Sequence, residues 1–502
     1  MAALASAATP KVELRTVNLR YFGPEGETEA LKDVSISIAP GEFVAIIGQS
    51  GCGKSTLLSL ISGILMPTDG TVLLDGKAVT GPSRKVGYML QQDYLFEWRT
   101  ILENAVLGAE IQGADMAKAR ERAAALLTRY GLGQFLRHLP RQLSGGMRQR
   151  VALARTLCTE PDVVLLDEPF AALDSQTRLA LSDEIAVILR REKKTAILVT
   201  HDIGEAVSMA ERVIVLSRRP GRVKSDHAIA FATGDGVRPP PLAARNAPEF
   251  NGYFIVRATQ LGLLAVLLLL WEVLPKALIV NPVLTSYPSA LWPTFLELLK
   301  STPQQASILT HTWGTVLATV LGFTGAMVLG TAVAAALWWW KTLYQVLDPY
   351  LVVANAMPKT AFVPIFYIWL GATLSIYGMS LAISVFITIL MIYSGFQGID
   401  PNKIKLAQTF GATKGQILRK VVLPGSVPTL LAALKVNAGL SLVGVVVGEF
   451  QSANLGLGYL IQYGAQIFKM NIVMTGVTIL AVVSSVMYLA ISWLETAVMR
   501  RR

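Results

Sequence analysis

Residues 48–55 read Gly48-Gln49-Ser50-Gly51-Cys52-Gly53-Lys54-Ser55, and they follow the apolar run Phe43-Val44-Ala45-Ile46-Ile47. The run predicts a strand, the glycines predict a tight turn, and Thr56-Leu57-Leu58 predicts the beginning of a helix. A glycine-rich turn in this position directs backbone N–H groups and the helix N-terminus at one anion. Lys54 adds a point charge for the β- and γ-phosphates of a nucleotide, and the Ser55 hydroxyl is suited to Mg²⁺. The stretch therefore predicts a phosphate-binding loop rather than a turn without a ligand.

Composition divides the chain into two parts. The chain has 502 residues, more than one ordinary domain, and with 52% hydrophobic and only 16% charged residues it is too apolar for a purely soluble protein. Charged helical stretches alternate with short apolar strands as far as Asp235, whereas long apolar runs dominate beyond Gly252. We therefore predict a soluble domain at 1–235, a Pro/Gly-rich linker at 236–252 and a membrane domain at 253–502.

The net charge of +11 does not indicate a nucleic-acid partner. Many of the basic residues lie beside apolar spans, for example between Lys403 and Lys420 and at Arg500-Arg501-Arg502. This placement is typical of the cytoplasmic charge bias of membrane proteins rather than of a nucleic-acid groove. Two cysteines, Cys52 and Cys158, do not indicate a disulfide framework and fit a reducing cytosol.

Several predicted strands end on polar residues. Asp167 and Glu168 follow the apolar run 163–166, where Asp167 can hold a metal ion and Glu168 can orient or deprotonate a water that attacks a γ-phosphate. Gln91 follows the strand predicted at 86–90, and a glutamine there can coordinate Mg²⁺ or a water. His201 follows the strand predicted at 195–200, and we expect its ring close to the same phosphate.

A second candidate anion site is Leu143-Ser144-Gly145-Gly146-Met147, which precedes another predicted helix. Two phosphate-binding helix ends this far apart in sequence usually meet across a dimer, so we expect a homodimer. Tyr21 lies ahead of the phosphate loop, in a region that predicts antiparallel strands. Its ring is a candidate for stacking on an adenine, with ordinary packing as the alternative.

Together these motifs resemble the nucleotide-binding domain of an ABC transporter over almost the whole soluble half. The resemblance covers the phosphate loop, the glutamine loop at Gln91, the signature at 143–147, the Asp167-Glu168 pair, the loop at Asp174 and the histidine loop at His201. Met147 stands where the family usually has glutamine, but the phosphate-facing Ser144 and Gly146 are intact. Glu168-Pro169-Phe170-Ala171-Ala172-Leu173-Asp174 and Trp98-Arg99-Thr100 are similar to the nitrate/sulfonate/taurine import branch in particular.

This resemblance implies ATP and Mg²⁺ as cofactors and a role for each motif residue. The implied catalytic residues are Glu168, His201 and Gln91, and the implied metal ligands are Ser55, Gln91 and Asp167. The residues implied to bind ATP of the same chain are Tyr21, Gly48, Ser50, Gly51, Cys52, Gly53, Lys54, Ser55 and Thr56. Those implied to bind ATP of the partner chain are Ser144, Gly145, Gly146, Met147 and Asp174.

The second half predicts about six membrane spans of roughly 20 apolar residues each. Their approximate positions are 253–274, 311–337, 346–370, 374–397, 427–449 and 473–495. The third is interrupted by Pro358 and Pro364. An even number of spans places both ends in the cytoplasm with the ATPase, together with the basic clusters. In the second span small residues recur at every fourth position and predict a close helix contact; they are Gly314, Ala318, Gly322, Ala326 and Gly330.

Between the fourth and fifth spans the chain reads Leu406-Ala407-Gln408-Thr409-Phe410-Gly411 and then Val421-Val422-Leu423-Pro424. This spacing is similar to the cytoplasmic coupling loop of ABC importer permeases, which we place at 402–424 with Ala407, Gly411, Leu423 and Pro424 as its matching positions. Lys405 and Leu406 replace the usual Glu-Ala. We expect a side chain at Gly411 to hit the ATPase surface or to distort the turn between two short helices. Gly448-Glu449 and 454–461 also resemble the sulfonate/nitrate permease branch.

Two lysines, Lys359 and Lys435, lie within or near predicted spans. A charge at mid-bilayer costs on the order of 3 kcal/mol on insertion scales. Each lysine is therefore expected either to face a pore, where Lys359 would meet an anionic substrate, or to extend to the cytoplasmic interface.

The resemblance implies an α/β P-loop ABC ATPase domain followed by an all-α polytopic membrane domain of the type I importer kind. The expected function is ATP-driven import of a small anion such as a sulfonate, taurine or nitrate across the bacterial inner membrane, with the ATPase in the cytoplasm. The expected partners are a second copy of the chain, membrane lipid and a periplasmic or lipid-anchored solute-binding protein. The alternatives are import of a pyrimidine vitamin precursor or other small organic solute, an ABC exporter, and a membrane-anchored ATPase that transports nothing.

Overall fold

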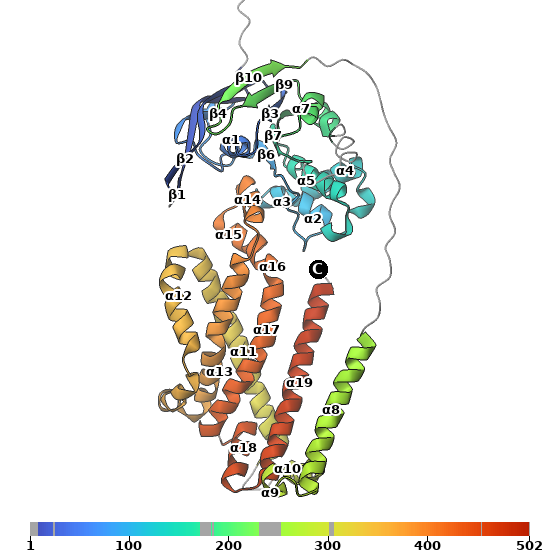
Figure 1. Cartoon of the computed structure of the whole chain (residues 1–502), viewed down its shortest axis with the longest axis vertical. Coiled ribbons are helices and arrows are strands. Elements are labelled where there is room, and N and C mark those ends of the chain that lie inside the picture. The colour runs from blue at the N-terminus through green and yellow to red at the C-terminus, as the bar shows by residue number, and fades with distance from the viewer. Residues whose placement is uncertain are drawn as a thin grey trace, which may run out of the picture. The chain divides into compact units, whose positions relative to one another are not determined.

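The computed structural model describes residues 9–23, 26–170, 182, 185–229, 253–300, 306–452 and 454–500. Contacts divide the chain into an N-terminal unit, formed by 1–236 together with 399–425, and a helical unit, formed by 237–398 and 426–501. Asp174 and the predicted linker 236–252 lie outside the described residues. Figure 1 shows the N-terminal unit as sheets with short helices and the helical unit as long helices.

The central sheet of the N-terminal unit has the strand order β10-β9-β3-β8-β7-β6. Five of its strands are parallel and mostly buried, as their β-branched and leucine-rich sequences predict. They are β3 (Phe43–Ile47), β6 (Val86–Met89), β7 (Val163–Asp167), β8 (Thr195–Thr200) and β9 (Arg212–Leu216), with β10 (Val223–Ala228) antiparallel at the edge. Because these strands are parallel, the residues that follow β3, β6, β7 and β8 all lie at one edge of the sheet.

A second, antiparallel sheet has the order β2-β1-β4-β5. It contains β1 (Val12–Gly23), β2 (Gly26–Ile38), β4 (Asp69–Leu74) and β5 (Lys77–Ala78). The prediction of antiparallel strands ahead of the phosphate loop is thereby confirmed. Alternate residues of β2 are buried, as expected for a sheet with one face on the core.

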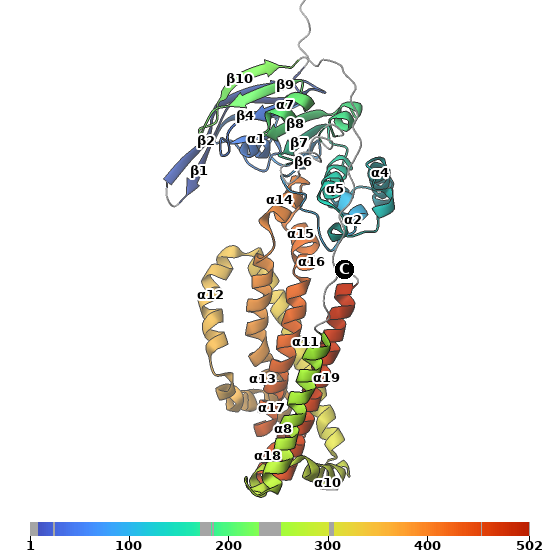
Figure 2. The same cartoon turned by 45° about the vertical axis from the view of Figure 1, so that its right-hand side comes forward.

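Helices cover the central sheet and supply much of its core (Figures 1 and 2). They are α1 (Lys54–Ile61), α2 (Ile101–Ala105), α3 (Leu107–Ile111), α4 (Met116–Arg129), α5 (Gly145–Leu157) and α7 (Ile203–Met209). Asp115 caps α4 by accepting a hydrogen bond from the backbone N–H of Ala117 at 2.9 Å. One continuous hydrophobic core joins residues of the parallel strands to residues of α2, α4 and α5.

Residues 399–425 form a compact helical segment of the N-terminal unit, although they lie in the second half of the sequence. The segment contains α14 (Pro401–Thr409), α15 (Lys414–Ile417), a π-helical turn at Leu418–Val422 and α16 (Leu423–Gly425). Asp400 begins α14 by accepting the backbone N–H of Asn402 at 2.8 Å. Phe410 ends it, and Gly411 follows with φ of 80°. We call residues 399–425 the docking segment.

Four described helical segments are long and apolar enough to cross a membrane: Ile308–Trp339, Lys359–Gln397, Val427–Gln451 and Met470–Met499. They contain α11 (Ile308–Trp339), α13 (Val363–Gln397), α17 (Val427–Ser452) and α19 (Met470–Arg500). They correspond to the second, fourth, fifth and sixth predicted spans. The first predicted span coincides with α8, a helix of 24 residues at Tyr253–Lys276.

The third predicted span, 346–370, is not a single helix: its predicted interruption at Pro358 is confirmed, whereas Pro364 lies in the first turn of α13 and interrupts no helix. The structure has α12 (Lys341–Ala356), then a short 3-10 turn at Lys359–Phe362, and only then α13. Pro358 lies at the break because proline removes a backbone donor and disfavours helix in the residue before it. A second interruption lies at Gly371 inside α13, where φ of 75° and ψ of 175° leave the helical region.

Small residues bring α11 close to α13, which confirms the contact predicted from the four-residue spacing. A Cβ atom placed on Gly322 would lie 2.2 Å from Ser380 Oγ, and one on Gly330 would lie 2.5 Å from Thr388 Cγ2. Ala326, between these glycines, is fully buried. Larger residues at these positions would force the helices apart, because the space for a side chain does not exist.

The first turn of α18 (Leu457–Gln466) is held by side chains of two other helices. The backbone N–H of Gly456 donates to His311 Nδ1 at 3.0 Å, that of Leu457 to Thr315 Oγ1 at 2.8 Å, and that of Gly458 to Glu449 Oε2 at 2.8 Å. Thr315 in turn donates to Glu449 Oε1 at 2.8 Å. The free N–H groups of a helix N-terminus need partners in a buried setting, and α11 and α17 provide them here.

The two lysines predicted to lie within or near spans, Lys359 and Lys435, both find partners in the helical unit. Lys359 Nζ donates to the carbonyl of Asn355 at 2.6 Å, at the end of α12. Lys435 on α17 forms an ion pair with Glu495 on α19. The sequence analysis expected each lysine to face a pore or to extend to the interface, and it did not anticipate the pair with Glu495. The spacing of residues along one helix does not show which residues of a distant helix they will contact.

Candidate functional site

The phosphate loop connects β3 to α1, and two of its glycines, Gly51 with φ of 79° and Gly53 with φ of 102°, adopt conformations that other residues rarely reach. Gly53 precedes α1 with φ of 102°, and a Cβ there would lie 2.7 Å from Leu31 Cδ2. Gly48 is also tightly enclosed, since a Cβ would lie 2.8 Å from Cys52 Sγ. Lys54 Nζ donates to the carbonyls of Gly48 at 2.8 Å and Gln49 at 3.1 Å, so the ammonium lies inside the loop.

Asp167 at the end of β7 contacts the start of α1. Its Oδ1 accepts a hydrogen bond from Ser55 Oγ at 2.9 Å, and its Oδ2 accepts one from Tyr88 OH at 3.1 Å. Burial raises the pKa of Asp167, while the hydrogen bonds from Ser55 and Tyr88 oppose that rise. A hydroxyl beside a carboxylate is an oxygen donor set suited to Mg²⁺. Ser55 and Asp167 therefore fit the metal implied by the sequence.

Residues that follow two further strands, β6 and β8, contact Glu168, which follows β7. Gln91 Nε2 donates to Glu168 Oε2 at 3.2 Å, and His201 Nδ1 lies 3.3 Å from the same oxygen. Glu168 has φ of 43°, a conformation that costs a non-glycine residue about 1–3 kcal/mol and that occurs often at functional sites. In this structure Gln91 contacts Glu168 and not the proposed metal ligand Asp167. The group formed by Gln91, Glu168 and His201 can position a water beside a phosphate.

Tyr21 and Thr56 lie next to each other at the entrance of the loop. The two hydroxyl oxygens are 3.4 Å apart, and Tyr21 is 42% exposed. An exposed ring beside the phosphate loop is available for stacking on a base, whereas a ring used only for packing would be buried.

The signature residues begin helix α5. Ser144 is the N-cap of this helix, and its Oγ accepts the backbone N–H of Met147 at 3.4 Å. Ser144 is exposed, and Gly145, Gly146 and Met147 are half-buried. Figures 1 and 2 show α1 and α5 as separate parts of the N-terminal unit, so the phosphate loop and the signature are presented on different helices.

Sequence reasoning did not single out Arg155, which anchors the loop behind Gln91. This side chain is fully buried and donates to the carbonyls of Asp93 at 2.6 Å and Tyr94 at 3.3 Å. Burial lowers the pKa of Arg155 to about 10, which still leaves it charged at neutral pH. Arg148 also contacts this loop, with its Nε 2.9 Å from Asp93 Oδ2. An arginine with apolar neighbours on a predicted buried helix face was the available signal.

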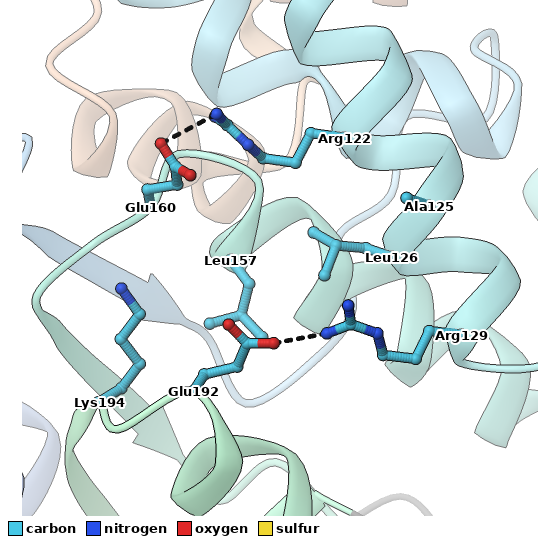
Figure 3. Close-up of a pocket in the computed structure, with 8 residues that line it drawn as sticks. All are labelled: Arg122, Ala125, Leu126, Arg129, Leu157, Glu160, Glu192 and Lys194. Atoms are coloured by element: carbon cyan, nitrogen blue, oxygen red, sulfur yellow. Dashed lines mark hydrogen bonds and ion pairs between the residues drawn. The ribbon is translucent and has the colours of Figure 1, made fainter.

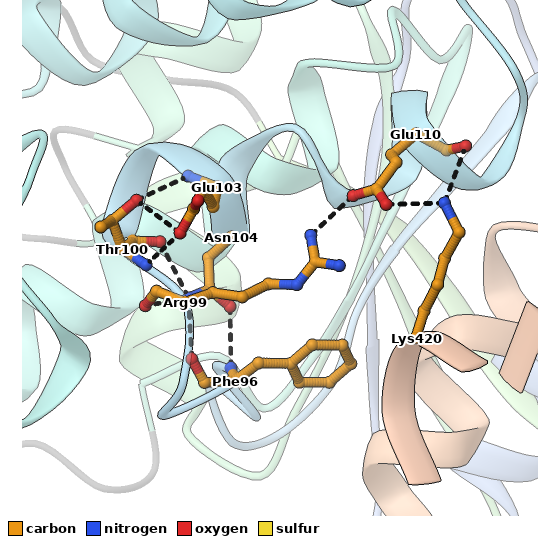
Figure 4. Close-up of polar contacts among 7 residues, drawn as sticks. All are labelled: Phe96, Arg99, Thr100, Glu103, Asn104, Glu110 and Lys420. Carbon is orange, nitrogen blue, oxygen red and sulfur yellow. Dashed lines mark hydrogen bonds and ion pairs between the residues drawn. The ribbon is translucent and has the colours of Figure 1, made fainter. Parts of the chain in front are cut away.

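The docking segment is held to the rest of the N-terminal unit by an acidic residue on α3. Glu110 Oε1 accepts from Lys420 Nζ at 2.6 Å, and Glu110 Oε2 accepts from Arg99 Nη1 at 2.6 Å (Figure 4). Burial alone would raise the pKa of Glu110, but the bonds from Arg99 and Lys420 lower it below its usual value. Gln416 Nε2 also donates to the carbonyl of Ile111 at 3.0 Å.

Other contacts of the docking segment are apolar or aromatic. Phe410 is buried against Gly108, where an added Cβ would lie 2.9 Å from the Phe410 ring. Lys403 Nζ lies 5.6 Å from the centroid of the Trp98 ring, and Lys405 Nζ lies 5.7 Å from that of the Tyr88 ring. These are cation–π distances.

The predicted loop positions have different surroundings. Ala407 is fully buried, whereas Leu423 and Pro424 are half-buried in and around α16. The expectation that a side chain at Gly411 would hit the ATPase surface is wrong, because a Cβ there would find no atom within 4 Å. Its φ of 80° supports the other expectation, distortion of the turn, since this conformation favours glycine.

A pocket of about 190 Å³ lies apart from these strand ends, between α4, the end of α5 and the segment before β8 (Figure 3). Two ion pairs cross its surface: Arg122 Nη2 lies 3.0 Å from Glu160 Oε2, and Arg129 Nη1 lies 2.5 Å from Glu192 Oε1. Lys194 completes the charged lining. Because acidic and basic groups alternate, the pocket does not present one charge to a ligand.

Comparison with known proteins divides the chain in the same way as its composition. The family model described as "ABC transporter" matches residues 31–171. The model described as "Binding-protein-dependent transport system inner membrane component" matches residues 326–502. One family model therefore matches part of each half of this chain, with the ATP-binding half first.

Curated relatives match the first half. An uncharacterized ABC transporter ATP-binding protein, YtlC of Bacillus subtilis, is 43% identical over 47% of this chain and 89% of its own length. The taurine import ATP-binding protein TauB of Roseobacter denitrificans is 39% identical over 48% of this chain and 90% of its own length. The nitrate import ATP-binding protein NrtD of a Synechocystis strain is 41% identical over 48% of this chain and 91% of its own length.

These matches agree with the site geometry and with the apolar helices of the second half. ATP hydrolysis in such proteins is coupled to transport, and the permease half places the chain in the inner membrane as a multi-pass protein with its ATPase in the cytoplasm. The chain belongs to the ABC transporter family, as an importer in which the ATP-binding domain is fused ahead of its permease domain.

Proposed function

We propose that this chain forms a homodimer that imports a small anion, a sulfonate such as taurine or nitrate, from a separate solute-binding protein. Each chain would contribute an ATPase domain at 1–235 and a permease domain at 253–502, joined by the linker at 236–252. Two copies would then supply the two ATPases and two permeases of a complete importer. Surrounding lipid and a periplasmic or lipid-anchored binding protein complete the assembly.

The observation that carries the substrate class is the pair of relatives named for taurine and nitrate import, at 39% and 41% identity. Taurine carries a sulfonate, and nitrate is a small oxyanion, so the two solutes share a compact anionic group. The identity extends over the ATPase half only. The description of the permease family as binding-protein-dependent supports a separate protein that delivers the solute.

The roles proposed for the ATP site follow from its contacts. The phosphate loop and Lys54 bind the phosphates, and the exposed Tyr21 ring stacks on the base. Ser55 and Asp167 hold Mg²⁺, which supplies positive charge to the phosphates when bound. Glu168 orients the attacking water, with Gln91 and His201 on its Oε2.

The dimer is proposed because the signature and the phosphate loop lie on different helices of the same unit. Ser144 to Met147 of one chain would bind the ATP held by Lys54 and Ser55 of the other, together with Asp174. An ATP between the two chains would draw the ATPases together. The docking segment would pass that movement to α13 and α17, the helices that it joins in the chain.

Transport across the membrane of proteoliposomes tests this function. The full chain would be reconstituted with its ATPase outside, ATP would be added there, and a panel of purified binding proteins loaded with labelled taurine, an alkanesulfonate, nitrate or a pyrimidine would be enclosed inside. We expect ATP-dependent movement of an anion out of the lumen, where the binding protein is, and only with a matching binding protein. The Lys54→Ala chain serves as the control without ATP binding.

Each of the other possible results of this experiment would indicate a different function for the chain. ATP-dependent movement of solute into the lumen without a binding protein would indicate an exporter. Transport only with the pyrimidine-loaded protein would replace the anion by the alternative substrate class. ATP hydrolysis without transport under every condition would favour an ATPase that is anchored in the membrane for another purpose.

A further inference from the structure

Tyr88 occupies an unusual position between the docking segment and the proposed metal site. It lies on β6 and is 1% exposed, and its hydroxyl donates to Asp167 Oδ2 at 3.1 Å. The other carboxylate oxygen, Oδ1, accepts from Ser55 Oγ at 2.9 Å. Both oxygens of Asp167 are therefore held by hydroxyl groups, one from α1 and one from the neighbouring strand.

The ring of Tyr88 is contacted by the docking segment. Lys405 on α14 places its Nζ 5.7 Å from the centroid of the Tyr88 ring. Lys405 stands where the resemblance leads one to expect an acidic residue, so this cation is a feature of the present chain.

We propose that Tyr88 is a positioning residue for Asp167 and that Lys405 holds the Tyr88 ring, so that the docking segment sets how well the ATPase binds Mg²⁺. The inference rests on the proposed role of Asp167 as a metal ligand. Residues that hydrogen-bond a metal ligand orient it and change metal affinity without touching the metal. Here the orienting residue, Tyr88, contacts the docking segment, which belongs to the permease half of the sequence.

If Tyr88 had a purely structural role, loss of its hydroxyl would leave the Mg²⁺ affinity unchanged. Phenylalanine fills nearly the same volume as tyrosine and keeps the ring that Lys405 contacts, so Tyr88→Phe should leave the core intact. The change removes the hydroxyl and with it the hydrogen bond to Asp167 and the contact with Ser59. If the hydroxyl acts on the metal ligand, the variant must lose Mg²⁺ affinity while its fold and its metal-free nucleotide binding stay unchanged.

The experiment measures the affinity of the purified full chain for a non-hydrolysable ATP analogue, first in EDTA and then at a series of Mg²⁺ concentrations. The factor by which saturating Mg²⁺ raises this affinity is the readout, because it cancels effects on nucleotide binding itself. We expect Tyr88→Phe to lower the factor about 10-fold. We expect Lys405→Gln to lower it about 2- to 5-fold.

Matched variants separate this effect from general disturbance. Tyr94→Phe removes a hydroxyl from a half-buried tyrosine of the same loop region, and Lys403→Gln removes a cation from the same helix, α14. Both should keep the wild-type factor. In the double variant Tyr88→Phe/Lys405→Gln, the lysine change should add nothing, because Lys405 acts through the hydroxyl that is already absent.

Asp167→Asn distinguishes failure of this inference from failure of the metal role beneath it. If Asp167→Asn lowers the Mg²⁺ factor and Tyr88→Phe does not, the positioning role of Tyr88 is overturned while the metal site stands. If Asp167→Asn leaves the factor unchanged, Asp167 does not hold the metal and both assignments fall. An equal loss in Lys403→Gln and Lys405→Gln would reject the specific role of Lys405.

Discussion

Glu110 and Lys420 form an ion pair with 2.6 Å between Oε1 and Nζ, although 310 positions separate them in the chain. Both side chains are largely shielded from solvent, with 28% and 22% exposure. Arg99 contacts the second carboxylate oxygen, so one acidic residue of the ATPase binds a cation of its own domain and one of the docking segment. The pair is a direct attachment between the sequence halves.

Lys420→Glu should weaken this attachment. The change replaces a charge-assisted hydrogen bond, which contributes about 1–3 kcal/mol, by repulsion from Glu110. We expect solute uptake per ATP hydrolysed to fall at least about 5-fold in proteoliposomes, with ATP binding retained. Arg419→Glu is the matched control, because Arg419 is the exposed neighbour on the same turn. Equal losses in both variants would mean that general charge matters rather than the pair.

Glu110 also predicts a pH dependence of stability. Its pKa is lowered from the usual 4.5 in the folded chain, so its ionised form contributes stability above about pH 4.5. This contribution is lost as the pH falls through the lowered folded pKa. Thermal unfolding of wild type and Glu110→Gln should therefore differ at neutral pH and converge in acid. A difference that grows as the pH falls would contradict the assignment.

Phe410→Ala should uncouple transport more than Gly411→Asp does. Phe410 is 4% exposed, and truncating a buried phenylalanine costs about 3–5 kcal/mol. A side chain at Gly411 meets open space and costs only the backbone strain of a positive φ, about 1–2 kcal/mol. Uptake and ATP hydrolysis measured on the same vesicles compare the two. The reverse order would show that the turn, and not the ring against Gly108, transmits the movement.

Glu168→Gln should bind ATP but lose nearly all turnover, since the amide cannot accept a proton from the attacking water. The expected loss is about 10²- to 10⁴-fold in hydrolysis rate, with a trapped dimer visible by mass measurement. Glu160→Gln is the control, because Glu160 pairs with Arg122 in the surface pocket away from the strand ends. Hydrolysis by Glu168→Gln within a few-fold of wild type would remove Glu168 from this role.

Mixed dimers test whether two chains share each ATP site. A dimer of one Lys54→Ala chain and one Ser144→Arg chain places both lesions in one site and leaves the other site intact. We expect this mixture to hydrolyse ATP while each variant alone does not. A monomer with full ATPase activity would refute the shared site, as would mixed dimers that are as inactive as the parents.

The motifs could be predicted from sequence because the residues that act together in each motif are close to one another in the chain. The phosphate loop needs glycines at 51 and 53 and a cation at 54, and these are adjacent in the chain. The meeting of Gln91, Glu168 and His201 could also be expected, since parallel strands end at one edge. Tyr88 could not be recognised, because its partner Asp167 depends on which strands are neighbours.

Long-range pairs and helix breaks were the main gaps. The contacts of Lys420 and Lys435 join segments whose separation in sequence carries no sign of their proximity. The break at Pro358 was predicted, because proline removes a backbone donor. The break at Gly371 was not, because a glycine within an apolar run can also continue a helix.

The three bonds at the start of α18 have a mechanical consequence. A helix whose first turn is hydrogen-bonded to His311 and Thr315 on α11 and to Glu449 on α17 cannot slide past α11 without breaking two of these bonds, or past α17 without breaking the third. The first turns of α11, the end of α17 and the start of α18 are therefore expected to move together as one rigid body. A hinge in the helical unit is therefore expected elsewhere, and Gly371, whose φ of 75° and ψ of 175° already interrupt the helical conformation of α13, is a candidate position.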